Sequence, residues 1–265
     1  MSTPGFVGSI PELYDRYMGP VLFEPYAREL AERLPRDATR VLEIAAGTGR
    51  VTRQLLARLP AHGELVVTDL NEPMLAEGRR RVGEDRRITW QTADAQALPF
   101  ADASFDVVVC AFGLMFPPDR ALAVREMRRV LRPGGTLLLS TWDSLAKNPA
   151  SALLHELAVA LMPENPPAFM ATPFSLHDPA ALRAFASAAG FAEATVDTVV
   201  RTGEAVSAAD LAAGFVRGNP LWNQLVERRV DAPAFERQVT EALRKTFGDQ
   251  PCSSALSAHV LVARA

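Results

Sequence analysis

The stretch VLEIAAGTGR, residues 41–50, decides how this sequence folds. Its first half is an apolar run of β type, and its second half is a turn of small residues that opens a helical pattern. Gly47 and Gly49 remove side chains where a backbone must approach a ligand closely. The N–H groups of the turn and of the helix start then face that ligand. The stretch therefore predicts a strand, a ligand-binding bend and a helix in succession.

Short β-type runs and helical patterns alternate along the chain around this stretch. The β-type runs are residues 41–45, 64–68, 88–92, 106–111 and 136–142, and the helical patterns between them are residues 51–59, 72–82 and 120–131. The strand cores are continuous apolar runs, as burial on both faces of a sheet requires. Strand, helix and strand repeated in this way predict right-handed crossovers and a parallel sheet.

The composition narrows the classes of partner. The chain has 265 residues, of which 48% are hydrophobic and 22% charged, with a formal net charge of −3. It has no basic run suited to a nucleic-acid backbone and no apolar stretch of the roughly 18 residues that a membrane span needs. The first eight residues lack a secretory pattern, and the two cysteines, Cys110 and Cys252, have no spacing that suggests a disulfide framework or a metal site. We therefore expect a cytoplasmic protein without metal, nucleic acid or membrane span, and leave a homodimer open.

The second half of the chain has a different pattern. Residues 151–162 are apolar nearly all round, and a proline-rich stretch follows. Asp178 before Pro179, and Ser207 three residues before Asp210, predict helix N-termini. Further strands are expected at residues 195–200 and 258–262. We expect a single domain over residues 1–265, built from an N-terminal helical cover (1–39), a cofactor-binding core (40–143) and helical insertions (144–176 and 205–254).

An acidic residue at the end of the second β-type run makes the bend more specific. Asp69 follows Gly47 by 22 residues, which is the place of a carboxylate that binds ribose hydroxyls. A dinucleotide site usually has a third small residue where this chain has Thr52. Glu43, inside the first run, is a poor neighbour for a pyrophosphate and suits a cationic group. A nicotinamide-dependent reductase is therefore the less favoured alternative.

These residues resemble a known family. The pattern Glu43-x-x-x-Gly47-x-Gly49 is similar to motif I of class I S-adenosylmethionine-dependent methyltransferases, in their ubiquinone/menaquinone-type or type 11 branch. Later motifs resemble the family in order: TDLNEPML (68–75), TADAQALPF (92–100), FDVVVCAF (105–112) and EMRRVLRPGG (126–135). The resemblance implies an α/β, Rossmann-like, doubly wound fold with a mostly parallel seven-stranded sheet and a helical lid over the acceptor site.

The resemblance also implies roles for residues around S-adenosylmethionine. Glu43 would face the ammonium group, Asp69 the ribose, and Asp94 the adenine amino group. The full expected set is Tyr14, Glu43, Ala45, Gly47, Thr48, Gly49, Asp69, Leu70, Met74, Asp94, Ala95, Cys110 and Ala111. Ordinary alternatives stay open, because Asp69 also suits a turn, Asp94 also suits a simple cap, and plain packing also suits Met74, Cys110, Tyr14 and Tyr17.

The acceptor side is expected to be apolar, and a general base is sought among the histidines. Methyl transfer from a sulfonium is an in-line displacement, for which orientation suffices with an acidic acceptor, whereas other acceptors call for a base. His155 and His177 are the candidate catalytic residues, and Asp143 is a further pocket residue. The expected substrate-binding residues are Tyr17, Phe116, Trp142 and Phe169. Their apolar character favours a quinone-like or polyketide-like ring.

The sequence thus predicts a methyltransferase that uses S-adenosylmethionine, releases S-adenosylhomocysteine and acts on a small hydrophobic molecule. The alternative is a protein of the same fold that binds the cofactor but performs other chemistry or regulation.

Overall fold

The chain divides into two compact units in the computed structural model, which describes residues 6, 8–167 and 171–265. We call Tyr26–Asp143, Pro173–Val199 and Ala258–Ala265 the sheet unit. We call Met1–Pro25, Ser144–Thr172 and Val200–Ser257 the helical unit. Each unit is described by itself.

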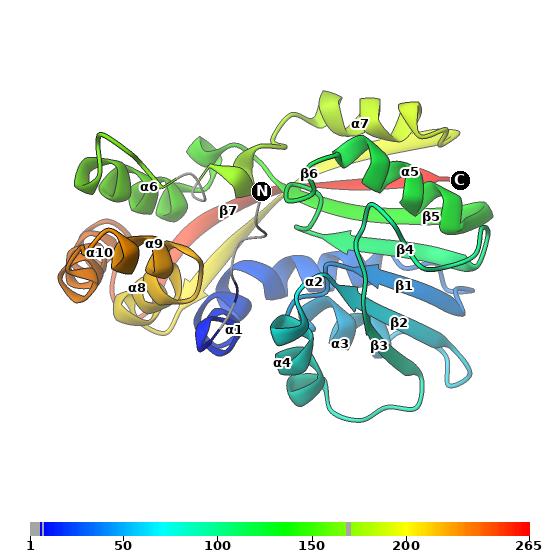
Figure 1. Ribbon diagram of the computed structural model, residues 1–265, viewed down its shortest axis with the longest axis horizontal. Coiled ribbons are helices and arrows are strands. Elements are labelled where there is room, and N and C mark those ends of the chain that lie inside the picture. Colours follow the sequence, from blue (N-terminus) through cyan, green and yellow to red (C-terminus); the bar gives the residue numbers. More distant parts are fainter. Residues whose placement is uncertain (1–5, 7, 168–170) are drawn as a thin grey trace. The chain divides into compact units, whose positions relative to one another are not determined.

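Seven strands form one sheet in the order β3-β2-β1-β4-β5-β7-β6 (Figure 1). They are β1 (Arg40–Ile44), β2 (Glu64–Asp69), β3 (Ile88–Thr92), β4 (Phe105–Ala111), β5 (Leu131–Trp142), β6 (Glu193–Ala205) and β7 (Cys252–Arg264). Strands β1 to β5 pair in parallel, and β7 runs antiparallel to β5. The predicted fold, a mostly parallel seven-stranded sheet of the doubly wound type, is confirmed.

Apolar strands at the centre of the sheet supply the core of the sheet unit. Leu42, Val108 and Leu137 stand at one level on β1, β4 and β5, and each is buried. Burial of such side chains contributes roughly 1.5–3 kcal/mol each. Because helices cover both faces of a parallel sheet, the strands have no polar face, which explains the unbroken apolar runs.

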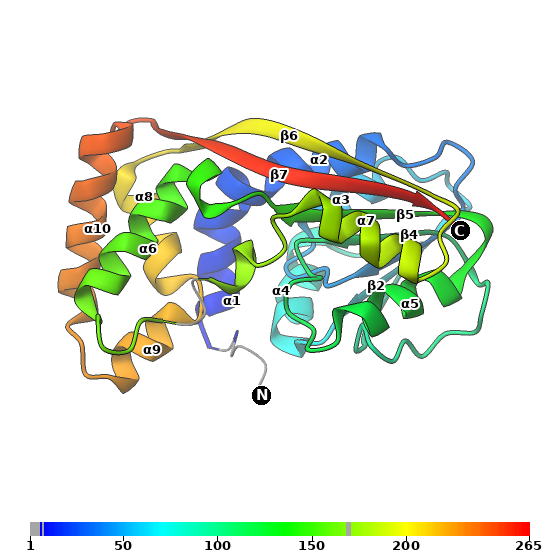
Figure 2. The same cartoon turned by 90° about the horizontal axis from the view of Figure 1, so that it is seen from above.

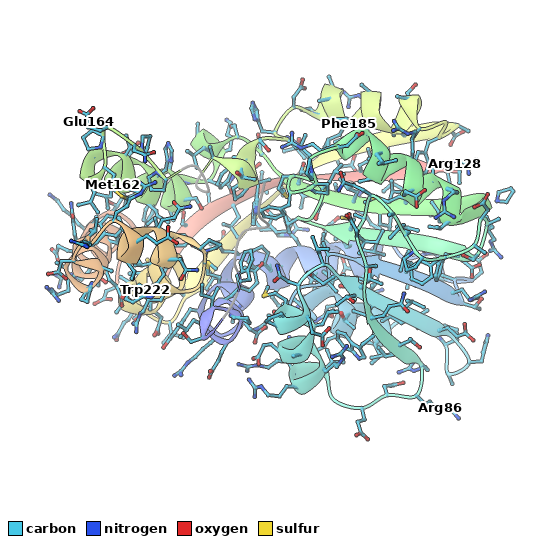
Figure 3. The ribbon with its side chains drawn as sticks, in the orientation of Figure 1. Arg86, Arg128, Met162, Glu164, Phe185 and Trp222 are labelled. Carbon is cyan, nitrogen blue, oxygen red and sulfur yellow. The ribbon has the colours of Figure 1, made fainter. Side chains whose placement is uncertain are left out.

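The helices of the sheet unit follow the strands as the sequence predicts. They are α2 (Glu24–Glu32), which begins at the unit boundary, α3 (Arg50–Leu56), α4 (Glu72–Val82), α5 (Arg120–Val130) and α7 (Pro179–Ala188). Helix α5 contacts α7. Figure 3 labels one side chain of each helix, Arg128 on α5 and Phe185 on α7. Asp178 caps α7 by accepting a hydrogen bond from the N–H of Ala180, as predicted.

Three strands exceed their predicted ranges by more than one residue. Strand β5 begins at Leu131, directly after α5, and Leu131 pairs with Phe105 before a register shift. The Pro-Gly-Gly segment at 133–135 therefore lies inside β5 rather than before it. Strands β6 and β7 have 13 residues each. Strand β6 extends past its predicted range through mostly exposed positions, whereas the residues added to β7, such as Cys252, Ser254 and Leu256, are largely buried.

The helical unit gathers the first helices, the segment after β5 and the segment between β6 and β7 (Figure 2). Its main elements are α1 (Ile10–Leu13), the π-helix η1 (Tyr14–Phe23), α6 (Pro149–Leu161), α8 (Ala208–Arg217), α9 (Leu221–Glu227) and α10 (Ala232–Phe247). Ser207 caps α8 by accepting from the N–H of Asp210, as predicted. Within the described ranges, no helix combines the length and apolar character that crossing a membrane requires.

Candidate functional site

The bend after β1 has an unusual backbone. Ala45, Gly47 and Gly49 all have positive φ, at 55°, 56° and 79°. A non-glycine residue in this region is strained and persists only where its surroundings hold it. The N–H of Ala46 donates to the carbonyl of Thr68 at 3.0 Å, which ties the bend to the end of β2. The predicted ligand-binding bend is therefore a fixed feature of the backbone.

The two glycines of the bend have different reasons to be glycine. A Cβ at Gly49 would lie 2.8 Å from Cγ2 of Val82 and 3.4 Å from the ring of Trp90. A Cβ at Gly47 would meet only the Met74 methyl group, at an ordinary 3.5 Å. Gly49 thus allows α4 and β3 to pack under the bend, a role that the motif alone did not indicate. Gly47 is constrained by its left-handed backbone.

Asp69 joins the end of β2 to the bend. Its Oδ2 accepts a hydrogen bond from the N–H of Gly47 at 2.8 Å, and its Oδ1 accepts from the N–H of Asn71 at 2.8 Å. Burial raises the pKa of Asp69 above its ordinary value, although these donors act in the opposite direction. The structure therefore brings together the two features, glycine bend and carboxylate, that the sequence spacing singled out.

Glu43 is buried on β1, with 1% of its surface exposed. Its Oε2 accepts a hydrogen bond of 2.7 Å from the hydroxyl of Thr52 on α3. Burial raises the pKa of Glu43 to about 8, and the nearby charge of Asp69 acts in the same direction. Thr52, which replaces the third small residue of a dinucleotide site, is thus the partner of this acid.

The residues predicted at the adenine lie around the ends of β2 and β3. Met74 is buried, whereas Leu70 is 53% exposed. The Oδ1 of Asp94 accepts a hydrogen bond from the N–H of Gln96 at 2.8 Å, so this carboxylate supports the local backbone. Ala95, beside it, is half-buried. The exposed apolar side chain of Leu70 directly follows Asp69, an arrangement that suits contact with the edge of a nucleoside.

The segment that follows β4 packs closely against the bend. Phe112 has a φ of +51°, and a Cβ at Gly113 would lie 2.4 Å from the Cβ of Ala45 and 2.9 Å from the Sγ of Cys110. Burial raises the pKa of Cys110 to about 12, which keeps its thiol protonated. Ala111 is half-buried. The sequence analysis missed Gly113, although a glycine directly after an apolar strand is a signal for close backbone approach.

A cluster of aromatic rings lies at the end of β5. Trp142 stacks on Phe112 with ring centroids 4.2 Å apart, and Tyr26 packs edge-on against both at 5.5 Å. The hydroxyl of Tyr26 donates to the carbonyl of Val199 at 3.1 Å. Trp142, predicted to bind substrate, is therefore part of a packed cluster and only 6% exposed. Phe116 is half-buried.

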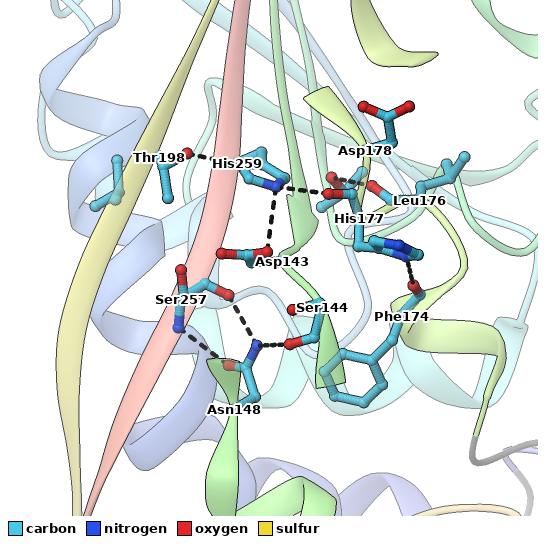
Figure 4. A network of polar contacts seen from close by, with 12 residues as sticks. Asp143, Ser144, Asn148, Phe174, Leu176, His177, Asp178, Thr198, Ser257 and His259 are labelled. Atoms are coloured by element: carbon cyan, nitrogen blue, oxygen red, sulfur yellow. Dashed lines mark hydrogen bonds and ion pairs between the residues drawn. The ribbon is translucent and has the colours of Figure 1, made fainter. Parts of the chain in front are cut away.

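His177 has an oriented imidazole ring (Figure 4). The side chain is exposed, and its Nδ1 lies 2.9 Å from the carbonyl oxygen of Phe174. A carbonyl only accepts hydrogen bonds, so the proton of the neutral ring is on Nδ1. The Nε2 atom consequently keeps its lone pair, which is the state that a general base requires.

Buried His259 contacts the backbone of the loop that carries His177 (Figure 4). Its Nε2 donates to the carbonyl of His177 at 2.8 Å, and its Nδ1 lies 3.0 Å from the hydroxyl of Thr198. Asp143 Oδ1 is 3.6 Å from the same Nε2. This network joins the end of β5, strands β6 and β7, and the loop before α7.

Other predicted residues belong to the helical unit or are outside the described ranges. The ring of Tyr14 stacks on Phe23 at 4.9 Å, and Arg16 lies over the ring of Tyr17 at 5.1 Å. His155 Nδ1 is buried without a hydrogen-bond partner among the described residues. Phe169 is not among the residues that the structure describes. The approach of these side chains to the bend stays a prediction.

Within the described part of the chain, no group of three or more His, Cys, Asp or Glu side chains could hold a metal ion. Glu43 and Asp69 supply two carboxyl groups at the bend.

Comparison with known proteins defines the class. Residues 41–135 match the family model described as a methyltransferase domain. This segment resembles a methyltransferase domain, and its strands lie in a sheet of the Rossmann-like type.

Particular relatives narrow the class further. Over 126 residues the chain is 41% identical to the ubiquinone/menaquinone biosynthesis C-methyltransferase UbiE of Idiomarina loihiensis, covering 46% of this chain and 48% of that protein. It is 44% identical over 114 residues to UbiE of Paracoccus denitrificans, covering 42% and 45%. The chain thus matches these curated relatives over about half of their length.

Solved structures extend the likeness of fold to nearly the whole chain. The [4+2]-cyclase SpnF has a TM-score of 0.58 at 17% identity, covering 96% of this chain and 92% of its own. A Haemonchus contortus phosphoethanolamine N-methyltransferase 2, solved with phosphomonomethylethanolamine and S-adenosylhomocysteine, has a TM-score of 0.55 at 16% identity, covering 97% and 60%. These similarities show the fold.

Proposed function

We propose that this chain transfers the methyl group of S-adenosylmethionine to a small hydrophobic acceptor and releases S-adenosylhomocysteine. The observation that carries the proposal is the carboxylate of Asp69 hydrogen-bonded to the N–H of Gly47. The bend follows β1, whose neighbours in the sheet are β2 and β4. Ligands of doubly wound sheets bind at this point, where the strand order reverses.

The residues of the bend fit the cofactor. A Cβ at Gly47 would meet the Met74 methyl group at an ordinary distance, and Glu43 is a buried acid that accepts a hydrogen bond from the neutral hydroxyl of Thr52. Asp69 would hold the ribose, Glu43 the ammonium group, and Asp94 the adenine. When bound, S-adenosylmethionine supplies an electrophilic methyl group on a sulfonium sulfur. Ala45, Thr48, Gly49, Leu70, Met74, Ala95, Cys110 and Ala111 complete the proposed cofactor site, with Tyr14 as its cover.

The acceptor would lie against apolar side chains. Tyr17, Phe116, Trp142 and Phe169 are the proposed contacts, and segments 144–176 and 205–254 the proposed lid. Most of the acceleration would come from holding the acceptor atom in line with the methyl group at about 3–3.5 Å. The similarity to quinone-pathway C-methyltransferases supports a ring as the acceptor.

His177 is the proposed general base, with His155 as the second candidate. The contact of Nδ1 with the carbonyl of Phe174 orients the ring of His177, and His259 holds the loop that carries it. The free, buried thiols of Cys110 and Cys252 support a reducing compartment, so a cytoplasmic location is part of the proposal. A small-molecule acceptor and no nucleic-acid partner complete it, with a homodimer left open.

The test begins with cofactor binding by calorimetry, with S-adenosylmethionine and with a nicotinamide dinucleotide. We expect binding of the first alone, and binding of the dinucleotide alone would overturn the proposal. Incubation with a panel of short-chain hydroxylated quinols should then give S-adenosylhomocysteine and a product heavier by one methyl group.

A second function is favoured by one specific observation. SpnF, a [4+2]-cyclase, has the same fold over 92% of its length. A protein of this fold can therefore perform chemistry other than methylation. Cofactor binding without any S-adenosylhomocysteine, together with conversion of a ring-forming substrate, would favour this alternative.

A further inference from the structure

Two acidic side chains lie close together at the bend, and among the described residues no basic side chain acts on the inner one. Burial and the negative charge of Asp69 raise the pKa of the Glu43 carboxyl, whereas hydrogen bonds from the hydroxyl and the N–H of Thr52 lower it. The thiol of Cys110 on β4 is also titratable, and burial raises its pKa so far that it stays protonated. Helix α3 carries Arg50 and Arg53, but neither is among the groups that act on Glu43.

An isolated carboxylate at this depth is costly. Burial of an unpaired charge is so unfavourable that the group takes up a proton or pairs with a cation. Only 1% of Glu43 is exposed, and its 2.7 Å hydrogen bond from Thr52 supplies a neutral donor rather than a positive charge. The free protein therefore holds Glu43 as the acid at neutral pH.

We propose that Glu43 is a cation subsite whose resting occupant is a proton, and that this proton is released to solvent when the ammonium group of S-adenosylmethionine binds. In this exchange the O–H bond of the Glu43 carboxyl breaks, the proton passes to water, and the carboxylate pairs with the ammonium group. The inference rests on the proposed cofactor site. It gives Glu43 a function in binding, and assigns it no part in methyl transfer.

Three ligands separate the possible sources of positive charge. S-adenosylmethionine has a sulfonium and an ammonium group, S-adenosylhomocysteine has only the ammonium group, and methylthioadenosine has neither. If Glu43 pairs with the ammonium group, the first two ligands release a proton and the third does not. If release occurs with S-adenosylmethionine alone, Glu43 faces the sulfonium and the ammonium assignment is wrong.

The experiment is calorimetry of the full chain at about pH 6.5, in buffers of different ionisation enthalpy. At this pH the amine of the ligand, with an ordinary pKa of about 7.7–8.0, is already charged. We expect close to one proton released per S-adenosylmethionine or S-adenosylhomocysteine bound. The affinity for both should rise about tenfold per pH unit between about pH 6 and 7, because binding and deprotonation are linked.

Two variants form a matched pair. Glu43→Gln keeps the shape and an acceptor for Thr52, and should release no proton and lose the pH dependence. Thr52→Val removes the hydrogen bond but keeps the carboxyl, and should still release a proton. The three-ligand comparison on the unaltered chain needs no variant, so the test stands even where a substitution impairs folding.

The outcomes are distinct. Tight binding of S-adenosylmethionine without proton release overturns the inference and leaves the proposed function intact. Equal release from the Glu43→Gln variant also overturns it, because the proton then comes from another group. Failure of all three ligands to bind overturns the proposed function, and the inference with it.

Discussion

The bend after β1 and the end of β5 are two ends of parallel strands that are built in different ways. Around the bend, the main partners Glu43, Gly47 and Thr52 are within nine residues of one another, and only Asp69 comes from the next strand. At the end of β5, by contrast, His259 binds residues 61 and 82 positions away in the sequence. The first site is local and resembles a family motif, whereas the second is assembled by the fold.

The difference teaches where function can vary on this fold. A site formed by one bend and one neighbouring strand can bind the same cofactor in many proteins. A site assembled from distant segments can change its acceptor without disturbing the bend. The identity to the UbiE proteins fits this division, since it covers 46% of the chain or less in the two cases compared, and the family match ends at residue 135.

The largest expected effect distinguishes the two glycines of the bend. In Gly49→Val, the added atoms meet Val82 at 2.8 Å or less while φ stays at +79°. We expect a loss of about 3 kcal/mol or more in the free energy of unfolding. Gly47→Ala should lose only about 1–2 kcal/mol, because its constraint is the left-handed backbone alone. Urea unfolding of both variants checks this, and equal losses would contradict the packing role of Gly49.

The next effect concerns stability against pH. The pKa of Glu43 is raised from 4.5 to about 8 in the folded chain, so the folded state holds one proton more than the unfolded state between these values. Its contribution to stability is thus present below about pH 4.5 and lost as pH rises through about 8, by roughly 1.4 kcal/mol per unit at most.

Glu43→Gln should remove this dependence. We expect the variant to be more stable than the unaltered chain at pH 8, by on the order of a few kcal/mol, and to match it more closely near pH 5. Unfolding by urea at several pH values measures this. A parallel pH profile in the two proteins would mean that Glu43 is ionised in the folded state.

Asp69→Ala should act mainly on the ligand. It removes the acceptor of the Gly47 and Asn71 N–H groups and of the proposed ribose hydroxyls. We expect the affinity for S-adenosylhomocysteine to fall at least tenfold, measured by calorimetry. Asp85→Asn, at an acid on the loop after α4, serves as the control. Unchanged affinity in Asp69→Ala would mean that the cofactor does not bind at the bend.

The sequence could predict the geometry of the bend because its determinants are short-range. Spacing alone paired Gly47 with Asp69, and the structure joins them at 2.8 Å. It could not predict that Trp142 stacks on Phe112, because side chains on separate strands meet only after the sheet has formed. For the same reason the sequence could not predict the partners of His259, because neither Thr198 nor the carbonyl of His177 is part of a sequence motif.

The smallest expected effect tests whether the two regions are independent. His259→Asn places an amide near the position of Nδ1 and loses the hydrogen bond to the carbonyl of His177, whereas His259→Gln places one near Nε2 and retains it. Because a lost buried hydrogen bond costs about 1 kcal/mol, we expect the Asn variant to be less stable than the Gln variant by that amount. Neither should change the affinity for S-adenosylhomocysteine, since the hydrogen bonds of His259 go to Thr198 and to the carbonyl of His177 rather than to the bend. If His259→Asn weakens the cofactor as strongly as Asp69→Ala does, the end of β5 also shapes the bend, and the division between a local cofactor site and an assembled acceptor site is wrong.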